Sequence, residues 1–274
     1  MRCLIVCHSS TGNTRFGVEI IRREMEEAGI DCQIRKVGEV SPGEIGEYDL
    51  VGVASPVFGF QPAFHLQEFL QGLPPLPGRL GFAFCSYSFS PANTLATLVE
   101  ALARKGITPL SAHAMQAEEA FPPFRLPAYI PSQGRPDLQD ARGVQQFARQ
   151  VIRHALEWKE GEREEMGGGV AHTAGFDHLT PFINRDLMRL SMGKWIVSEA
   201  RCIRCGRCAQ VCPIGAIALQ PFPVRGKGCI GCWGCFNLCP QGAIESNLAH
   251  NRLRYPGMRE YQKMRIERAL EETI

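Results

Sequence analysis

The chain is 274 residues long, and 45% of its residues are hydrophobic. This length and composition fit a globular protein with one sizeable domain and a smaller second one, and they exclude a transmembrane protein because no apolar run is long enough to cross a bilayer. The net charge of +2 hides a basic C-terminal part, in which residues 185–268 hold fourteen Lys and Arg against five Asp and Glu.

The first 160 residues alternate between strand patterns and helix patterns, which favours a parallel α/β sheet. Because the N-terminus starts directly as a strand and not as a signal peptide, we expect a cytoplasmic protein. Four cysteines in or beside the apolar strands are predicted to be buried core thiols: Cys3, Cys7, Cys32 and Cys85. The expected strands are residues 4–7, 32–37, 48–54, 80–85 and 107–115, and the expected helices are 15–28, 91–105 and 137–159.

A run of small polar residues joins the first expected strand to the first expected helix. It consists of Ser9, Ser10, Thr11, Gly12, Asn13 and Thr14. Backbone N–H groups, hydroxyls and the helix dipole together suit a phosphate at such a turn. The run has neither the Lys of a Walker A loop nor the G-x-G-x-x-G of a Rossmann turn. An ordinary capped turn is the alternative, although the run holds more polar residues than a cap needs.

This run resembles the flavodoxin phosphate loop T-x-T-G-N-T, with Ser9 in place of the first Thr. The resemblance implies that residues 9–14 bind the phosphate of FMN. It also implies that two loops, at the carboxyl ends of the third and fourth expected strands, sandwich the flavin. Phe58 and Tyr87 are the predicted stacking residues, unless these aromatics only close the core. The predicted flavin-binding residues of the two loops are Ser55, Pro56, Val57, Phe58 and Gly59, and Ser86, Tyr87 and Ser88.

Two segments are expected to connect the halves of the protein. Residues 117–136 are rich in proline and aromatics, which favours a lid or an interface. Residues 160–169 are charged and then Gly-rich, which is typical of a domain boundary. Apolar residues that follow are expected to dock one half on the other: Phe176, Leu179, Phe182, Ile183, Leu187 and Leu190. His172 and His178, in the same stretch, are more simply surface histidines than cofactor ligands.

Eight of the twelve cysteines lie in two copies of the pattern C-x2-C-x2-C-x3-C-P. Three cysteines with two residues between each pair can supply three of the four ligands of a [4Fe-4S] cluster from one short loop. The fourth ligand must come from elsewhere. A structural zinc site usually has no third Cys in register, and disulfides would need an oxidising compartment. The first copy holds Cys202, Cys205, Cys208 and Cys212, and the second holds Cys229, Cys232, Cys235 and Cys239.

The doubled spacing resembles that of bacterial two-cluster ferredoxins, in which the last Cys of each motif ligates the other cluster. The resemblance implies that Cys239 completes the cluster of the first motif and Cys212 that of the second. The chain as a whole is similar to flavodoxin-like domains fused to two-cluster ferredoxins. We therefore expect a flavodoxin-like doubly wound parallel five-stranded sheet with a smaller α+β two-cluster ferredoxin domain. The expected boundaries are 1–160, 161–194 (connecting segment), 195–247 and 248–274 (helical tail).

The implied function is electron transfer between two [4Fe-4S] clusters and FMN, and to or from a redox partner protein. The basic C-terminal part favours compensation of cluster charge and an acidic partner over nucleic-acid binding. One alternative is an FMN-dependent reductase of a quinone or an activated alkene, with Tyr87, Tyr129 or His178 as candidate proton donors. Another is a redox sensor or a zinc-stabilised interaction module.

Overall fold

The computed structural model describes residues 1–160, 170 and 180–271. Its N-terminal half is built on a five-stranded sheet in the order β2-β1-β3-β4-β5, with every neighbouring pair parallel. This is the flavodoxin-like strand order, and it confirms the predicted fold class. The strands are β1 (Arg2–Cys7), β2 (Asp31–Lys36), β3 (Leu50–Pro56), β4 (Leu80–Tyr87) and β5 (Thr108–Gln116).

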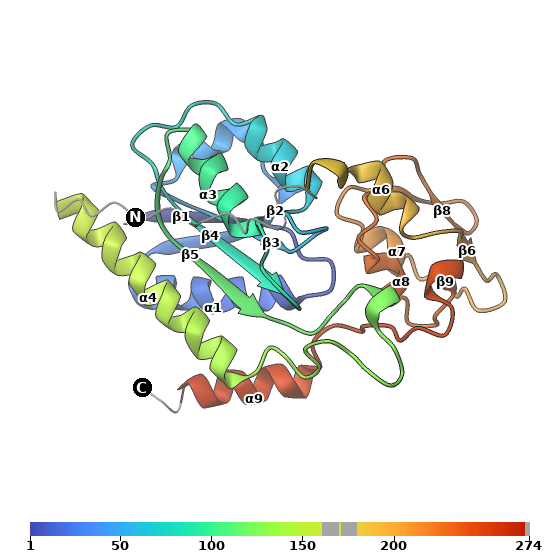
Figure 1. Ribbon diagram of the computed structural model, residues 1–274. Coiled ribbons are helices and arrows are strands. Elements are labelled where there is room, and N and C mark those ends of the chain that lie inside the picture. Colours follow the sequence, from blue (N-terminus) through green and yellow to red (C-terminus); the bar gives the residue numbers. More distant parts are fainter. Residues whose placement is uncertain (161–169, 171–179, 272–274) are drawn as a thin grey trace.

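Helices cover both faces of this sheet (Figure 1). On β1, Cys3 and Ile5 face one core, while Leu4 and Val6 face the other, as the pleat of a doubly covered strand requires. The four cysteines predicted to be core thiols are all buried. None of the described helices is long and apolar enough to cross a membrane. One face packs on α1 (Asn13–Glu27) and α4 (Leu138–Glu160), and the other on α2 (Phe64–Gln71) and α3 (Thr94–Arg104).

The C-terminal helix α9 (Glu260–Glu271) returns to the N-terminal half and packs beside α4. Its Ile266 and Leu270 are buried in the same core as α1 and α4. Their spacing of four residues puts both side chains on one face of the helix. The tail therefore fastens the far end of the chain to the flavodoxin-like half.

The cysteine-rich region is a small repeat of strand pairs and one-turn helices. The pairs are β6 (Trp195–Val197) with β9 (Ile244–Ser246), and β7 (Ile217–Leu219) with β8 (Pro223–Arg225), both antiparallel. The helices are α7 (Arg207–Gln210) and α8 (Gly234–Asn237).

The two motifs share their backbone conformation. The third residue of each has a positive φ, 55° at Arg204 and 74° at Gly231, and so does the fifth, 73° at Gly206 and 59° at Trp233. A positive φ is unusual for residues such as Arg and Trp. The repeat is therefore structural as well as sequential.

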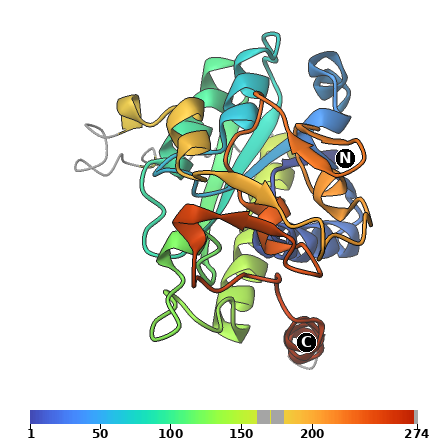
Figure 2. The same cartoon turned by 90° about the vertical axis from the view of Figure 1, so that its right-hand side faces the viewer.

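The cysteine-rich region lies against the carboxyl edge of the five-stranded sheet (Figures 1 and 2). The helix α6 (Arg185–Leu190) and the residues before it form one bridge to this edge. Gln61 Nε2, after β3, donates to the Ile183 carbonyl at 2.8 Å, and Arg185 pairs with Glu68 of α2 at 2.6 Å. Residues 183–185, which the structure describes, thus contact the flavodoxin-like half.

The side chains that make this bridge differ from those predicted. Phe182, Leu187 and Leu190 are exposed, at 75%, 46% and 66%. Their predicted docking role is wrong, because hydrogen bonds, an ion pair and Ile183 make the contacts instead. Phe176 and Leu179, like His172 and His178, lie outside the described residues.

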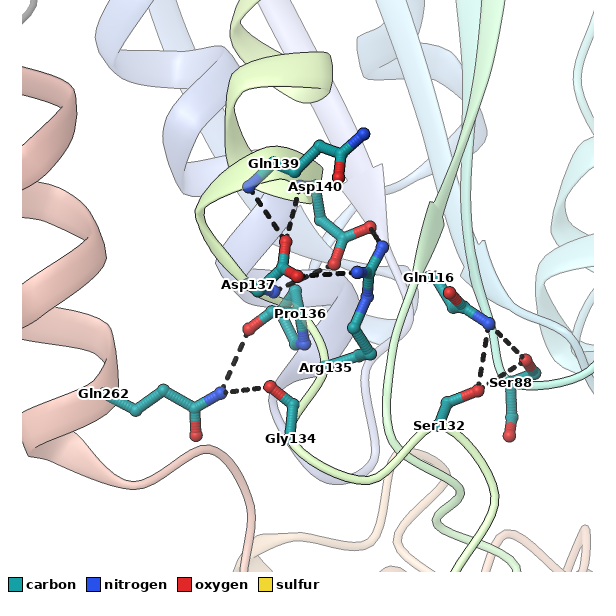
Figure 3. Close-up of polar contacts among 10 residues, drawn as sticks. All are labelled: Ser88, Gln116, Ser132, Gly134, Arg135, Pro136, Asp137, Gln139, Asp140 and Gln262. Atoms are coloured by element: carbon teal, nitrogen blue, oxygen red, sulfur yellow. Dashed lines mark hydrogen bonds and ion pairs between the residues drawn. The ribbon is translucent and has the colours of Figure 1, made fainter.

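Residues 117–136 form a second bridge, and Figure 3 shows how its two ends are held. Gln116 Nε2 and Ser132 Oγ both donate to the Ser88 carbonyl, at 3.2 and 2.8 Å. At the C-terminal end of the segment, Gln262 Nε2 of α9 donates to the carbonyls of Gly134 and Pro136, each at 3.0 Å. In the middle, the Ala120 carbonyl accepts from Asn237 of α8 at 2.8 Å. The segment is thus an interface, one of the two roles expected for it.

Two helical glycines allow a matched test of core packing. A methyl group on Gly17 of α1 would lie 2.3 Å from the ring of Phe84, whereas one on Gly143 of α4 would lie 3.5 Å from His113. Gly17→Ala should therefore lower the free energy of unfolding by about 1–3 kcal/mol through overpacking. Gly143→Ala should raise it by about 0.5–1 kcal/mol, the ordinary gain of Ala in a helix.

Thermal unfolding followed by circular dichroism measures both changes. Equal effects of the two substitutions would show that the close approach of α1 to β4 is not as described.

Candidate functional site

The first of two cavities in the cysteine-rich region lies beside β6 and β9. It encloses about 370 Å³ of empty space, part of which is open to solvent. Ile244 of β9 forms one wall, and Ile203 beside it is 60% exposed. The cysteines that line this cavity are Cys202, Cys205 and Cys208 of the first motif and Cys239 of the second.

The second cavity has three cysteines from the second motif and one from the first, the reverse of the first cavity. It encloses about 320 Å³ of empty space, and Ile217 takes the place that Ile244 has in the first. None of its cysteines is exposed, whereas Cys205 of the first cavity is. The cysteines that line it are Cys229, Cys232 and Cys235 of the second motif and Cys212 of the first. The structure thus brings together the two crossed groups of cysteines that the ferredoxin resemblance implies.

The crossing cysteines sit in equivalent hydrogen-bonded turns. The amide of Ala216 donates to Cys212 Sγ at 3.2 Å, and the amide of Ala243 donates to Cys239 Sγ at 3.3 Å. Burial raises the pKa of Cys232 to about 11, although hydrogen bonding from the Gly234 amide and from Ser10 lowers it. Such thiols ionise when they bind iron, so assembly of a cluster here would release protons.

Each cavity is lined by four cysteines, which is the number of protein ligands that one [4Fe-4S] cluster takes. Among the described residues, no three His, Cys, Asp or Glu side chains converge as they would on a single metal ion. Two buried donors beside the second cavity, Arg225 Nη1 and Trp233 Nε1, have no hydrogen-bond acceptor in the described chain. The cysteine sets and these donors fit a negatively charged iron–sulfur cluster.

The polar run after β1 forms an open turn at the N-terminus of α1. Gly12 has a φ of 104°, and no heavy atom lies within 4 Å of a methyl group built on it. Ser9 Oγ accepts from the amides of Gly12 and Arg15, both at 3.2 Å. The first turn of α1 has no acidic residue. Free space, hydroxyls and a helix N-terminus without a carboxylate fit the phosphate of FMN.

The last two residues of the run have structural contacts. Thr14 Oγ1 lies 2.8 Å from Ser86 Oγ, and both side chains are buried. Asn13 accepts from the Tyr255 hydroxyl at 2.5 Å and donates to the Glu118 carbonyl at 3.3 Å. The half-buried residues 9–12 are therefore the part of the run that a ligand could reach.

The two predicted flavin loops lie side by side at the carboxyl edge. The amide of Val57 donates to the Ser86 carbonyl at 2.9 Å. Phe58 is 8% exposed and packs edge-to-face on Phe64, with ring centroids 5.7 Å apart, while Tyr87 is half-buried. Within the first loop, Ser55 Oγ and Gly59 face protein, since the Ser55 hydroxyl accepts from the Ala63 amide at 3.0 Å and a methyl on Gly59 would clash with Ile183.

Two aromatic residues of these loops were not singled out from the sequence. Phe60 is 38% exposed and Phe89 is 62% exposed, so both offer more accessible ring surface than Phe58 does. Each is the last aromatic residue of its loop, and this position in the sequence could have pointed to them. The other loop residues, Pro56 and Ser88, lie where the two strands end.

The second cavity borders the polar run directly. A methyl group on Gly234 would lie 3.3 Å from the Ser10 carbonyl oxygen and 3.7 Å from Cys232 Sγ. Ser10 is also close enough to Cys232 to lower the pKa of its thiol. The first cavity is lined by Val197 of β6 and Ile244 of β9, and Figure 1 shows these two strands on the side of the region that faces away from the sheet. One cavity is therefore inner and the other outer.

A buried histidine pair, which the sequence did not reveal, lies beneath Ser10. Ser10 Oγ is 3.0 Å from His8 Nε2, and the rings of His8 and His65 meet edge-to-face with centroids 4.4 Å apart. Burial lowers the pKa of His65 to about 4, and the charge of Arg185 lowers it further in the same direction. Burial lowers the pKa of His8 as well, so both rings are neutral near pH 7.

The comparisons with known proteins agree with this division. Residues 195–218 match the family model described as a 4Fe-4S binding domain. No sequence among the curated proteins matches the chain.

Solved structures similar to this chain include two flavodoxins and an oxidoreductase. A flavodoxin from the domain Archaea is 19% identical, with a TM-score of 0.45 over 57% of this chain and 99% of that one. Flavodoxin 1 from Bacillus cereus is 13% identical, with a TM-score of 0.46 over 56% and 99%. Rubredoxin oxygen:oxidoreductase from Desulfovibrio gigas is 17% identical, with a TM-score of 0.46 over 57% and 36%. The chain therefore combines a flavodoxin-like parallel sheet with a cysteine-rich region that contains a match to the 4Fe-4S binding domain.

Proposed function

We propose that this protein is an electron-transfer iron–sulfur flavoprotein that passes electrons between two [4Fe-4S] clusters and FMN, and to or from a redox partner protein. The observation that carries the proposal is the crossed set of four cysteines around each cavity, with the inner cavity against the polar run after β1. When bound, each cluster exchanges one electron, and FMN exchanges two in single steps.

The residues of the chain hold and separate these centres. Cys202, Cys205, Cys208 and Cys239 are the proposed ligands of the outer cluster, and Cys229, Cys232, Cys235 and Cys212 those of the inner one. Ile244 and Ile217 shield equivalent sides of the two sites. The proposed division of the chain is 1–160, 161–194, 195–247 and 248–274.

The proposed FMN site uses the turn at the N-terminus of α1 and the two loops after β3 and β4. Ser9, Ser10, Thr11 and Gly12 would hold the phosphate, while Asn13 and Thr14 keep the turn in place through Tyr255 and Ser86. Residues 55–59 and 86–88 would flank the flavin, with Phe60 and Phe89 as additional aromatic neighbours.

The outer cavity is the proposed point of contact with the redox partner. Cys205 is exposed beside Ile203, and Arg204 and Arg207 are exposed at the same rim. An apolar centre surrounded by cations fits an acidic protein, whose charge would steer the encounter.

The crossed ligation predicts an unusual pattern of iron loss. Anaerobically purified protein should contain about eight iron and about eight acid-labile sulfide per chain, as two cubane clusters require. Cys212→Ala combined with Cys229→Ala should remove one cluster and leave about four iron, because both residues would serve the inner cluster. Cys212→Ala combined with Cys202→Ala should impair both clusters.

Iron and sulfide assays on the purified variants measure this pattern. Cys85→Ala is the matched control, because Cys85 is a buried core thiol and its loss should leave the iron content unchanged. The reverse pattern for the two double variants would mean that each motif ligates its own cluster, and stoichiometric zinc without sulfide would exclude the clusters altogether.

A charge placed in the polar run should weaken FMN binding. Thr11→Glu would set a carboxylate against the FMN phosphate, and we expect roughly tenfold or greater loss of affinity, about 1.4 kcal/mol or more. Thr11→Gln is the control, since it has nearly the same size without the charge. Fluorescence titration of apoprotein with FMN gives both dissociation constants. Equal affinities of the two variants would place the phosphate elsewhere.

A further inference from the structure

The two cavities differ in the polar groups that surround them. Arg225 and Trp233 both line the inner cavity, and the Nη1 of the first and the Nε1 of the second are buried without an acceptor among the described residues. No residue that lines the outer cavity has such a buried, unpartnered side-chain donor in the described chain.

Arg225 is held in place by the strand pair that carries it. It lies opposite Ile217 at the end of the pair formed by β7 and β8, and Ile217 also lines the inner cavity. Its Nη2 donates to the Gly193 carbonyl at 3.4 Å, and no described carboxylate pairs with it. A guanidinium cannot lose its proton, and a buried cationic donor without a partner is costly. The site therefore calls for an anion next to Arg225.

The arginines of the outer cavity have other surroundings. Arg204 is exposed and stacks over the ring of Phe222, with its guanidinium carbon 4.7 Å from the ring centroid. Arg207 is exposed as well. Water and salt screen exposed charges, so these two arginines act weakly on a nearby cluster compared with Arg225, which is half-buried and has a buried Nη1.

We propose that Arg225, together with the indole N–H of Trp233, hydrogen-bonds the inner cluster and raises its reduction potential. This inference rests on the proposed presence of two clusters. Reduction adds one electron and one negative charge to a cluster without making or breaking a bond to the protein. A half-buried cation with a buried donor, and hydrogen bonds to the cluster sulfurs, stabilise that extra charge, because neighbouring charge and hydrogen bonds to the sulfurs help set cluster potentials. The electron is thereby favoured on the cluster that borders Ser10 and the proposed FMN site.

The test is a redox titration of the full-length parent and three variants, with dithionite as reductant and electron paramagnetic resonance as readout. Arg225→Met removes the charge and the N–H donors of the guanidinium but keeps a side chain of similar length. One of the two cluster potentials should fall, while the other stays unchanged. Trp233→Phe removes only a neutral donor and should lower the same potential by less. Arg225→Lys keeps the charge and should restore part of the shift.

The matched control is Arg204→Met, which removes an arginine at the rim of the outer cavity and should leave the sensitive potential where it is in the parent. Iron and sulfide are measured first on every sample. A parent with fewer than two clusters contradicts the proposed function, whereas two intact clusters with unchanged potentials in Arg225→Met contradict only the role of Arg225. An equal shift of the same potential in Arg204→Met would also contradict the role of Arg225. If Arg225→Met loses a cluster, Trp233→Phe still tests the proposal, because an unchanged potential in that variant contradicts it.

Discussion

Each cysteine motif places three thiols around its own cavity and the fourth around the cavity of the other motif. Neither cavity is therefore complete unless both motifs are folded, and the region must form as one unit. Its hydrophobic core is small, and several of its members are the cysteines themselves. Small domains with little core need an additional source of stability, and metal binding commonly supplies folding free energy. Cluster assembly and folding of this region are thus expected to be coupled.

The position of the inner cavity is fixed by a buried polar junction. Arg125 is 3% exposed, pairs with Glu118 at 2.8 Å and donates to the carbonyl of Leu253 at 3.2 Å. Tyr255, two residues after Leu253, donates a hydrogen bond from its hydroxyl to Asn13 of the polar run. The guanidinium of Arg125 lies over the Tyr255 ring. Arg125 also donates to the carbonyls of Glu119 and Arg254, so this one side chain ties residues 118–119 to residues 253–254. The junction holds the cysteine-rich region at the carboxyl edge of the sheet, where ligands of such sheets bind.

The sequence predicted the features that local spacing determines. Alternating strand and helix patterns predicted the sheet, and the Cys spacing, read through its family resemblance, predicted the two crossed groups. Helix α2 was missed because it is short. The sequence left open whether Phe58 stacks on the flavin or closes the core, because its inward position depends on a tight turn in which the Phe58 amide donates to the Gln61 carbonyl. The buried donor of Arg225 is a tertiary feature, since it arises only when β8 is paired beside the cavity.

The proposed electron path joins both halves of the chain where Ser10 lies beside Gly234 and Cys232. The most direct test is flash reduction of the flavin in the fully loaded parent, with the rate of equilibration between flavin and clusters followed over a tenfold range of protein concentration. An intramolecular path predicts a rate that does not change with concentration. A rate that rises in proportion to concentration would contradict it.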